Sequence, residues 1–224
     1  MIIAKDIYGF KSEISDYRNM IAPFGLNLQS NNLCVSIFKQ MMLLNFIIAN
    51  NDSLPYKSFM QSIIYDVLSS QISILNKRER YFHLNIRSIV EHTARISLQK
   101  VDNGGEFDLF VRKDDFENLK ANNSDENWIY LHQNYTQSCA WVHASTKAKI
   151  NINATFNELL NSDSHSSINK QITHLHKIAS EVLSIIFNYY HVEILSSFYR
   201  NLNELKYLLG NSLYTIFHER FCKS

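Results

Sequence analysis

The sequence is short of the two residues that most often form tight turns. Its 224 residues include 5 glycines and 2 prolines, whereas the turns of all-β folds and the loops that cradle phosphates depend on these residue types. No GxGxxG or GxxxxGK[ST] loop occurs, which excludes nucleotide binding through either motif. The scarcity favours helices joined by polar loops. These loops are rich in asparagine and serine, as in NNSDEN and NSDSHSSIN.

Cysteine is also scarce. Cys34, Cys139 and Cys222 are odd in number and widely spaced, and no CxxC pair is present. This pattern argues against a disulfide framework and against a zinc site made of thiolates. It indicates free thiols in a reducing compartment. No HExxH motif is present either, so we expect neither a metal nor a cofactor.

A strong charge of either sign and a long apolar run are both missing. The chain has 22 Lys and Arg against 21 Asp and Glu, for a formal net charge of +1, so no bulk field favours nucleic acid or a membrane. The most apolar run, MMLLNFIIA at 41–49, is too short to span a bilayer. The N-terminus lacks the basic and apolar regions of a secretion signal. We expect a cytoplasmic protein without a membrane partner.

Apolar residues recur at helical spacing along most of the chain. The pattern predicts helices over about 33–50, 55–75, 81–100, 106–122, 125–144 and 168–199, then a last helix over 201–217. Residues 150–160 form a weak segment, and residues 1–30 form an N-terminal extension that packs on the rest. We predict an all-α fold, an antiparallel bundle of four to six main helices, in a single domain spanning residues 1–224.

Several helix ends carry recognisable signals. Ser53 is suited to cap the helix that begins near Pro55. Ser124 and Asn127 are candidate caps for the helix over 125–144. Gly210 is expected to bend or end the last helix. These signals place the turns but do not identify a function.

Four ionisable residues recur at every fourth position of YFHLNIRSIVEHTARISL, namely His83, Arg87, Glu91 and Arg95. On a helix they are neighbours. A helical wheel places His83 and Arg87 within or beside the apolar arc, Glu91 at its edge and Arg95 further out. Because unpaired charge is costly to bury, we expect Arg87 to pair with Glu91. One interpretation is a structural ion pair that fixes how this helix docks in the bundle.

A second interpretation rests on Arg87 and His92, which form an R-x4-H pattern. This pattern resembles the motif of HEPN-type helical ribonucleases and toxins, in which a histidine moves protons and an arginine stabilises phosphate charge without a metal. A five-residue step rotates by about 140° on a helix. The two side chains therefore point apart on a straight helix, and they would meet only across a dimer interface or at a distortion. Arg78 and His83 satisfy the same pattern.

The segment SCAWVHAST, which contains His143, is similar to a motif in some bacterial helical families related to HEPN proteins. IRSIVEHTAR is similar to their Arg-x-x-x-Glu helix. The resemblance implies that Arg87, Glu91 and His143 meet inside one bundle. It further implies a metal-independent endoribonuclease with a toxin or phage-defence role. Arg87 would stabilise phosphate charge, Glu91 would orient Arg87, and His92 or His143 would move protons. A hydrogen-bonded core histidine is the other interpretation of His143.

Two short basic clusters are candidates for contact with RNA. Lys77, Arg78 and Arg80 precede an aromatic pair, and Lys147 and Lys149 follow SCAWVHAST. Such clusters can contact phosphates. Solvated helix ends explain them equally well.

The competing class is a non-catalytic helical interaction module or an accessory subunit of a bacterial defence complex. Its partner would be a protein or a second copy of the chain, because aromatic stretches such as YYHVEILSSFY at 189–199 can cover another helix as well as a core. An enzyme requires Arg87 and a histidine to share an accessible cleft. A module requires Arg87 to be closed against Glu91, with an apolar surface elsewhere.

Overall fold

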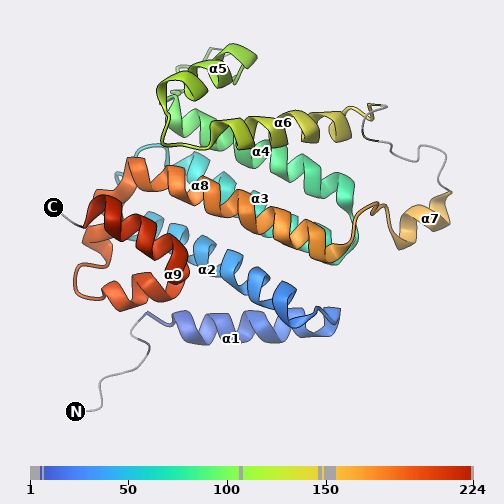
Figure 1. The fold of residues 1–224 in the computed structure, drawn as a ribbon, viewed down its shortest axis with the longest axis horizontal. Coiled ribbons are helices and arrows are strands. Elements are labelled where there is room, and N and C mark those ends of the chain that lie inside the picture. Colours follow the sequence, from blue (N-terminus) through green and yellow to red (C-terminus); the bar gives the residue numbers. More distant parts are fainter. Residues whose placement is uncertain (1–5, 7, 106–107, 146–147, 149–154, 223–224) are drawn as a thin grey trace.

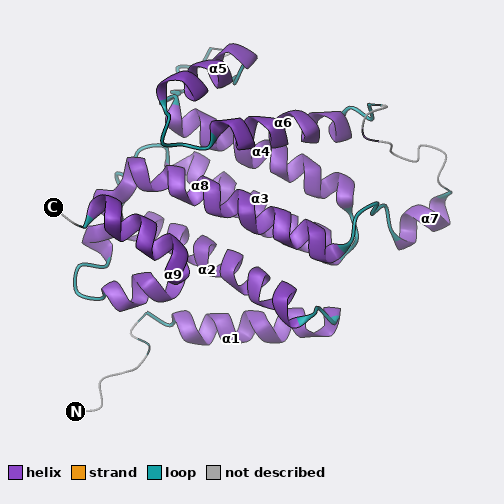
Figure 2. Ribbon diagram, viewed as in Figure 1, coloured by secondary structure: helices purple, strands orange, loops and turns teal. Residues whose placement is uncertain are grey.

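The computed structural model describes residues 6, 8–105, 108–145, 148 and 155–222, and every regular element within these ranges is helical (Figure 2). The elements are α1 (Phe10–Ile21), the 3-10 helix η1 (Ala22–Phe24), α2 (Leu28–Asn50), α3 (Lys57–Leu75), α4 (Glu79–Ser97), α5 (Lys113–Asn122), α6 (Trp128–Val142), α7 (Phe156–Asn161), α8 (Ile168–Ser197) and α9 (Leu202–Phe221). The predicted all-α bundle is confirmed. Six of these described helices have 15 or more residues.

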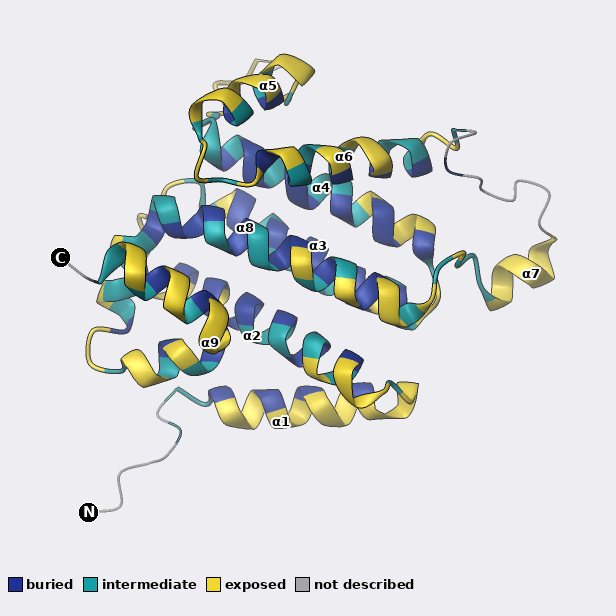
Figure 3. Cartoon of the chain, viewed as in Figure 1, coloured by how far each residue is buried: buried dark blue, intermediate teal, exposed yellow. Residues whose placement is uncertain are grey.

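The helices lie roughly side by side, with α1 at one edge of the bundle and α6 near the other (Figure 1). α2 packs against α8, α3 and α9, while α4 packs most extensively against α3 and then against α6. The core runs along the facing sides of these helices (Figure 3). Its largest fully buried side chains include Trp128, Tyr190, Phe82 and Phe187. One continuous core therefore joins the beginning of the described chain to its end.

The N-terminal region is more regular than the sequence analysis expected. α1 buries Phe10, Ile14, Tyr17 and Ile21, which follow helical spacing and pack on α2. α2 begins at Leu28 and not near residue 33, because the Asn27 side chain caps it by accepting a 2.8 Å hydrogen bond from the backbone of the third following residue.

Of the candidate N-caps, Asn127 is confirmed, whereas Ser124 and Ser53 do not cap their helices. Asn127 caps α6 by accepting a hydrogen bond from the backbone N–H of Tyr130. Ser53 does not cap α3. That helix begins two residues after Pro55, and its N-cap is Tyr56, which adopts the left-handed conformation with φ 55°. α3 therefore follows a tight turn and begins without a side-chain cap.

Of the segments predicted near 106–122 and 150–160, the structure describes α5 at 113–122 and α7 at 156–161. Residues 106–107 and 149–154 lie outside the described ranges, as do Lys147 and Lys149 of the second basic cluster.

The C-terminal hairpin contains two backbone interruptions. Gly210 bends α9 as expected, with φ 73° and ψ 171°. The second interruption was not predicted. It lies at Tyr190 in α8, where φ is −132°. The Tyr190 hydroxyl donates a 2.8 Å hydrogen bond to the carbonyl of Pro55, so this break accompanies a contact with the turn before α3.

α2 is long and apolar enough, by length and composition, to cross a membrane. Within its most apolar 18-residue window the mean hydropathy is 1.5, and 56% of the window is buried inside the bundle. Packing on α1, α3, α8 and α9 accounts for this burial. A central position in a helical core explains the same apolar composition.

Candidate functional site

The candidate site lies on α4, which is held between α3 and α6. Contacts between α4 and α6 descend in antiparallel order: Arg80 Nη2 donates to the carbonyl of Val142 at 3.1 Å, His83 Nδ1 lies 3.2 Å from the Ser138 hydroxyl, and the Arg87 guanidinium carbon lies 5.7 Å from the centre of the Tyr135 ring. We call His83, Arg87, Glu91 and Arg95 the α4 ladder. Each member therefore sits at a defined level of the α4–α6 interface or just beyond it.

Arg87 lies close to an acidic and an aromatic partner. Its Nη2 lies 3.7 Å from Glu91 Oε2, and its guanidinium lies over Tyr135. The Arg87 side chain is 35% exposed, whereas that of Glu91 is 14% exposed. Burial opposes the charged form of Arg87, but the hydrogen bond to Tyr135 and the negative charge of Glu91 outweigh it, so the pKa of Arg87 is raised. The expected Arg87–Glu91 pair is present.

Glu91 has a closer partner in Arg95. The distance from Arg95 Nη2 to Glu91 Oε1 is 2.7 Å. Arg95 Nη1 lies 3.1 Å from His92 Nδ1, and Arg95 Nε donates to the carbonyl of Leu109 at 2.8 Å. Although Arg95 lies further out on the helical wheel, its side chain is only 16% exposed. The loop that carries Leu109 covers it, and a wheel drawn for one helix cannot show that loop.

His92 faces α3, whereas Arg87 faces α6. Its Nε2 lies 4.0 Å from Asp66 Oδ2 on α3, and its ring lies 5.9 Å from the ring of Phe59. Burial, with the positive charge of Arg95, lowers the pKa of His92 to about 4. The imidazole is therefore neutral near pH 7. Within one copy of the chain, Arg87 and His92 therefore contact different neighbouring helices.

His83 is the ladder residue that enters the core. It is 4% exposed, and its ring stacks on Trp141 with 4.5 Å between ring centres and 14° between ring planes. Burial lowers the pKa of His83 to about 4, although the charge of Glu79 acts in the opposite direction. This histidine is a neutral, hydrogen-bonded core residue that fixes how α6 packs on α4.

His143 does not join the ladder. It is the exposed C-cap residue of α6, one position past Val142, whose carbonyl contacts Arg80. Arg80 and Arg87 are seven residues apart on α4, or about 10 Å along the helix axis. The expectation that His143 meets Arg87 and Glu91 was wrong. The histidine of that interior is His83, and its i+4 relation to Arg87 was the available sequence signal.

A second polar cluster joins the start of α4 to the loop before α8. Glu79 is 4% exposed. Its carboxylate accepts hydrogen bonds from the backbone N–H of His165 and from the backbone and hydroxyl of Ser166. Asp163 in turn accepts from the Glu79 backbone N–H. The sequence analysis did not predict this role, because Glu79 lies within a basic run. Arg78 of the same run donates hydrogen bonds to two carbonyls of α7.

Metal ligands do not gather in the described ranges. Among these residues, no group of three or more His, Cys, Asp or Glu side chains is placed to hold a metal ion. Cys34, Cys139 and Cys222 are free thiols. Cys139 and His143 are linked through their backbones, by an N–H to carbonyl hydrogen bond of 3.0 Å.

Comparison with known proteins adds no relative. Neither protein-family models, nor curated proteins, nor solved structures give a match to the chain. The resemblance to HEPN-type proteins therefore stays a prediction.

Proposed function

We propose that the chain is a non-catalytic helical module that associates with a second copy of itself through the outward face of α3. The observation that carries the first half of this proposal is the divergence of Arg87 and His92. Arg87 faces Tyr135 on α6, and His92 faces Asp66 on α3. General acid–base chemistry needs a proton-transfer group within hydrogen-bond reach of the same substrate that the cation stabilises. The α4 ladder serves instead to lock three helices together.

The outward face of α3 supports the second half. Tyr65 is 72% exposed and Ile72 is 61% exposed, and their seven-residue separation places them on one face of the helix. Leu68, between them, is partly buried against the core. On the neighbouring α4, Tyr81 and Leu84 are also exposed. Large apolar side chains gathered on adjoining helices are typical of a protein interface.

The charge distribution on α3 favours a second copy as the partner. Lys57 and Asp66 are the only charged residues in the sequence of this helix. Asp66 is buried and faces His92. In a two-fold symmetric contact the same patch meets itself, so like charges at its centre would repel. The centre of α3 presents no such charge to its copy.

Sedimentation equilibrium tests the proposal. The wild-type chain should be a dimer at about 100 μM, which is a concentration suited to a modest interface. Tyr65→Glu combined with Ile72→Glu should give a monomer with unchanged helical circular dichroism. Ile129→Glu is the matched control, because Ile129 is 63% exposed on α6, and this variant should remain a dimer. A monomeric wild type, including one that binds a different protein, would overturn the proposed self-association.

The endoribonuclease activity remains the second candidate, favoured by the accessible third of the Arg87 side chain. Purified wild-type protein should be incubated with mixed RNA beside Arg87→Ala, His92→Ala and His143→Ala. The module proposal predicts no cleavage by any of them. Cleavage by the wild type that disappears in the folded variants would instead establish the enzyme.

A further inference from the structure

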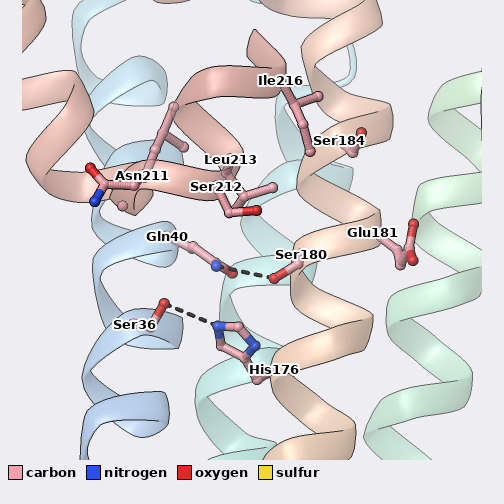
Figure 4. A pocket seen from close by; sticks show the side chains of 12 residues that line it. Ser36, Gln40, His176, Ser180, Glu181, Ser184, Asn211, Ser212, Leu213 and Ile216 are labelled. Atoms are coloured by element: carbon pink, nitrogen blue, oxygen red, sulfur yellow. Dashed lines mark hydrogen bonds between the residues drawn. The ribbon is translucent and has the colours of Figure 1, made fainter.

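A cavity of about 350 Å³ opens between α2, α8 and α9, and no residue of the α4 ladder lines it. Its polar lining comes mainly from α2 and α8, and its apolar lining comes from Leu209, Leu213 and Ile216 on α9. Figure 4 shows Gln40 reaching from α2 toward Ser180 on α8, close to residues 211–213. A cavity of this size and mixed character is typical of small-molecule sites.

Gln40 carries a polar atom that the protein leaves without a partner. The residue is 0% exposed, and its Nε2 donates to the Ser180 hydroxyl at 3.3 Å, while its Oε1 has no hydrogen-bond partner. Turning the amide over would exchange the roles of the two atoms but would still leave one of them unpaired. An unsatisfied buried polar atom is costly. A ligand in the cavity would remove that cost.

The kink at Gly210 adds to the same wall. Gly210, Asn211 and Ser212 line the cavity, and the non-helical backbone of Gly210 interrupts α9 there. The backbone at this interruption therefore lies in the same cavity wall as the amide of Gln40.

The remaining polar groups disfavour an anionic ligand. His176 Nε2 lies 3.1 Å from the Ser36 hydroxyl, and burial lowers the pKa of His176, which keeps its ring neutral near pH 7. Among the described residues that line the cavity, no lysine or arginine is present and Glu181 supplies a carboxylate. A phosphate would find no cation here.

We propose that this cavity binds a small uncharged molecule of the nucleoside class. A nucleobase has flat apolar faces that suit Leu213 and Ile216, together with an edge of donors and acceptors that suits Gln40. A ribose would add hydroxyls for the serines of α2 and α8. The inference is independent of self-association, because the cavity shares no residue with α3.

Isothermal titration calorimetry with adenosine, guanosine, cytidine and uridine tests the inference on the full chain. At least one of them should bind with a dissociation constant of about 1 mM or lower. Its 5′-monophosphate should bind several-fold more weakly. Absence of binding by all four nucleosides would overturn the inference, as would tighter binding of the monophosphate.

Two variants assign the binding to this cavity. Gln40→Leu keeps the side-chain volume but removes the amide, and it should weaken binding by about tenfold. Ser212→Trp places a large ring in the cavity from an exposed position, so it should abolish binding even if Gln40→Leu fails to fold. Asn203→Trp, at an exposed position of α9 outside the cavity lining, should bind like the wild type. Unchanged binding in Ser212→Trp would overturn the assignment.

Discussion

Arg87 and His92 lie five residues apart on α4 and contact opposite neighbours, Tyr135 on α6 and Asp66 on α3. Arg95 connects these two sides, because it contacts both Glu91 and His92. Glu91 in turn reaches Arg87. The polar residues of α4 thus form one chain of contacts around the helix, and this arrangement is the basis for expecting a docking role.

Arg95 should matter more for stability than Arg87. Arg95→Ala leaves the partly buried carboxylate of Glu91 without its closest partner and the Leu109 carbonyl without its donor, so we expect a loss of about 2–4 kcal/mol. Arg87→Ala removes a longer and more exposed pair, and it should cost about 1 kcal/mol or less. Urea denaturation measures both.

The double variant with Glu91→Gln tests whether these losses come from the ion pair. In combination with Arg95→Ala, the cost should be smaller than the sum of the single losses, because the unpaired charge of Glu91 is gone. Equal losses for Arg87→Ala and Arg95→Ala would contradict the order of importance that the contacts indicate.

The stability of the fold should fall with acid because of His83. Burial lowers the pKa of His83 from 6.5 to about 4. Between these pH values the unfolded chain binds more protons than the folded chain. The contribution of the neutral His83 to the free energy of unfolding is therefore complete above pH 6.5 and declines toward pH 4. The full loss is on the order of 3 kcal/mol.

His83→Phe isolates this effect, because phenylalanine can keep the stacking on Trp141 and does not titrate. Its free energy of unfolding, measured by urea denaturation from pH 7 to pH 4, should decline less steeply than that of the wild type. His143→Asn removes an exposed histidine and should leave the wild-type slope. A slope unchanged in His83→Phe would rule out the buried neutral imidazole.

The sequence predicted the helices more accurately than their surroundings. Stripes at helical spacing revealed the main helices, and the buried positions Ile14 and Tyr17 show that α1 carried the same signal in a stretch assigned to a mixed extension. The partners of Arg95 and His92 could not be predicted. They depend on the Leu109 loop and on α3, whose positions follow from tertiary packing and not from the periodicity of α4.

In the candidate site, too, contacts within one helix could be predicted and contacts between helices could not. The Arg87–Glu91 pair follows from spacing within one helix. The distance between His143 and Arg87 depends on the register of α6 against α4, which Ser138 and Trp141 set by packing on His83. A motif match in two separate segments carries no information on that register.

Gly210 should be intolerant of any side chain. Its φ of 73° and ψ of 171° lie in a region that is essentially restricted to glycine. A Cβ at this position would meet no atom within 4 Å, so the cost of Gly210→Ala would be conformational and not steric. We expect a loss of about 1–3 kcal/mol, measured by urea denaturation. Ser212→Ala, two residues later at an exposed position, should change the stability by less than ~0.5 kcal/mol. A neutral Gly210→Ala would show that α9 is a continuous helix.

Glu79 should be the most sensitive single carboxylate for the α8 end of the bundle. It accepts hydrogen bonds from two backbone N–H groups and from the Ser166 hydroxyl while almost fully buried. Glu79→Gln preserves the shape but removes the negative charge that two backbone N–H groups share. The expected loss is about 2–3 kcal/mol, with faster amide hydrogen exchange at residues 165 and 166, whose N–H groups lose a charged acceptor.

Glu117 provides the matched control, because its carboxylate pairs with Lys120 at 2.8 Å on the surface and its side chain is 53% exposed. Glu117→Gln should leave both the free energy of unfolding and the exchange at residues 165 and 166 close to those of the wild type. If Glu79→Gln were equally mild, the loop before α8 would be held mainly by its other contacts, such as those of Asp163 with the Glu79 backbone and of Gln171 with Ser166. Glu79→Ala combined with Asp163→Ala would then cost no more than Asp163→Ala, a comparison that separates the two arrangements.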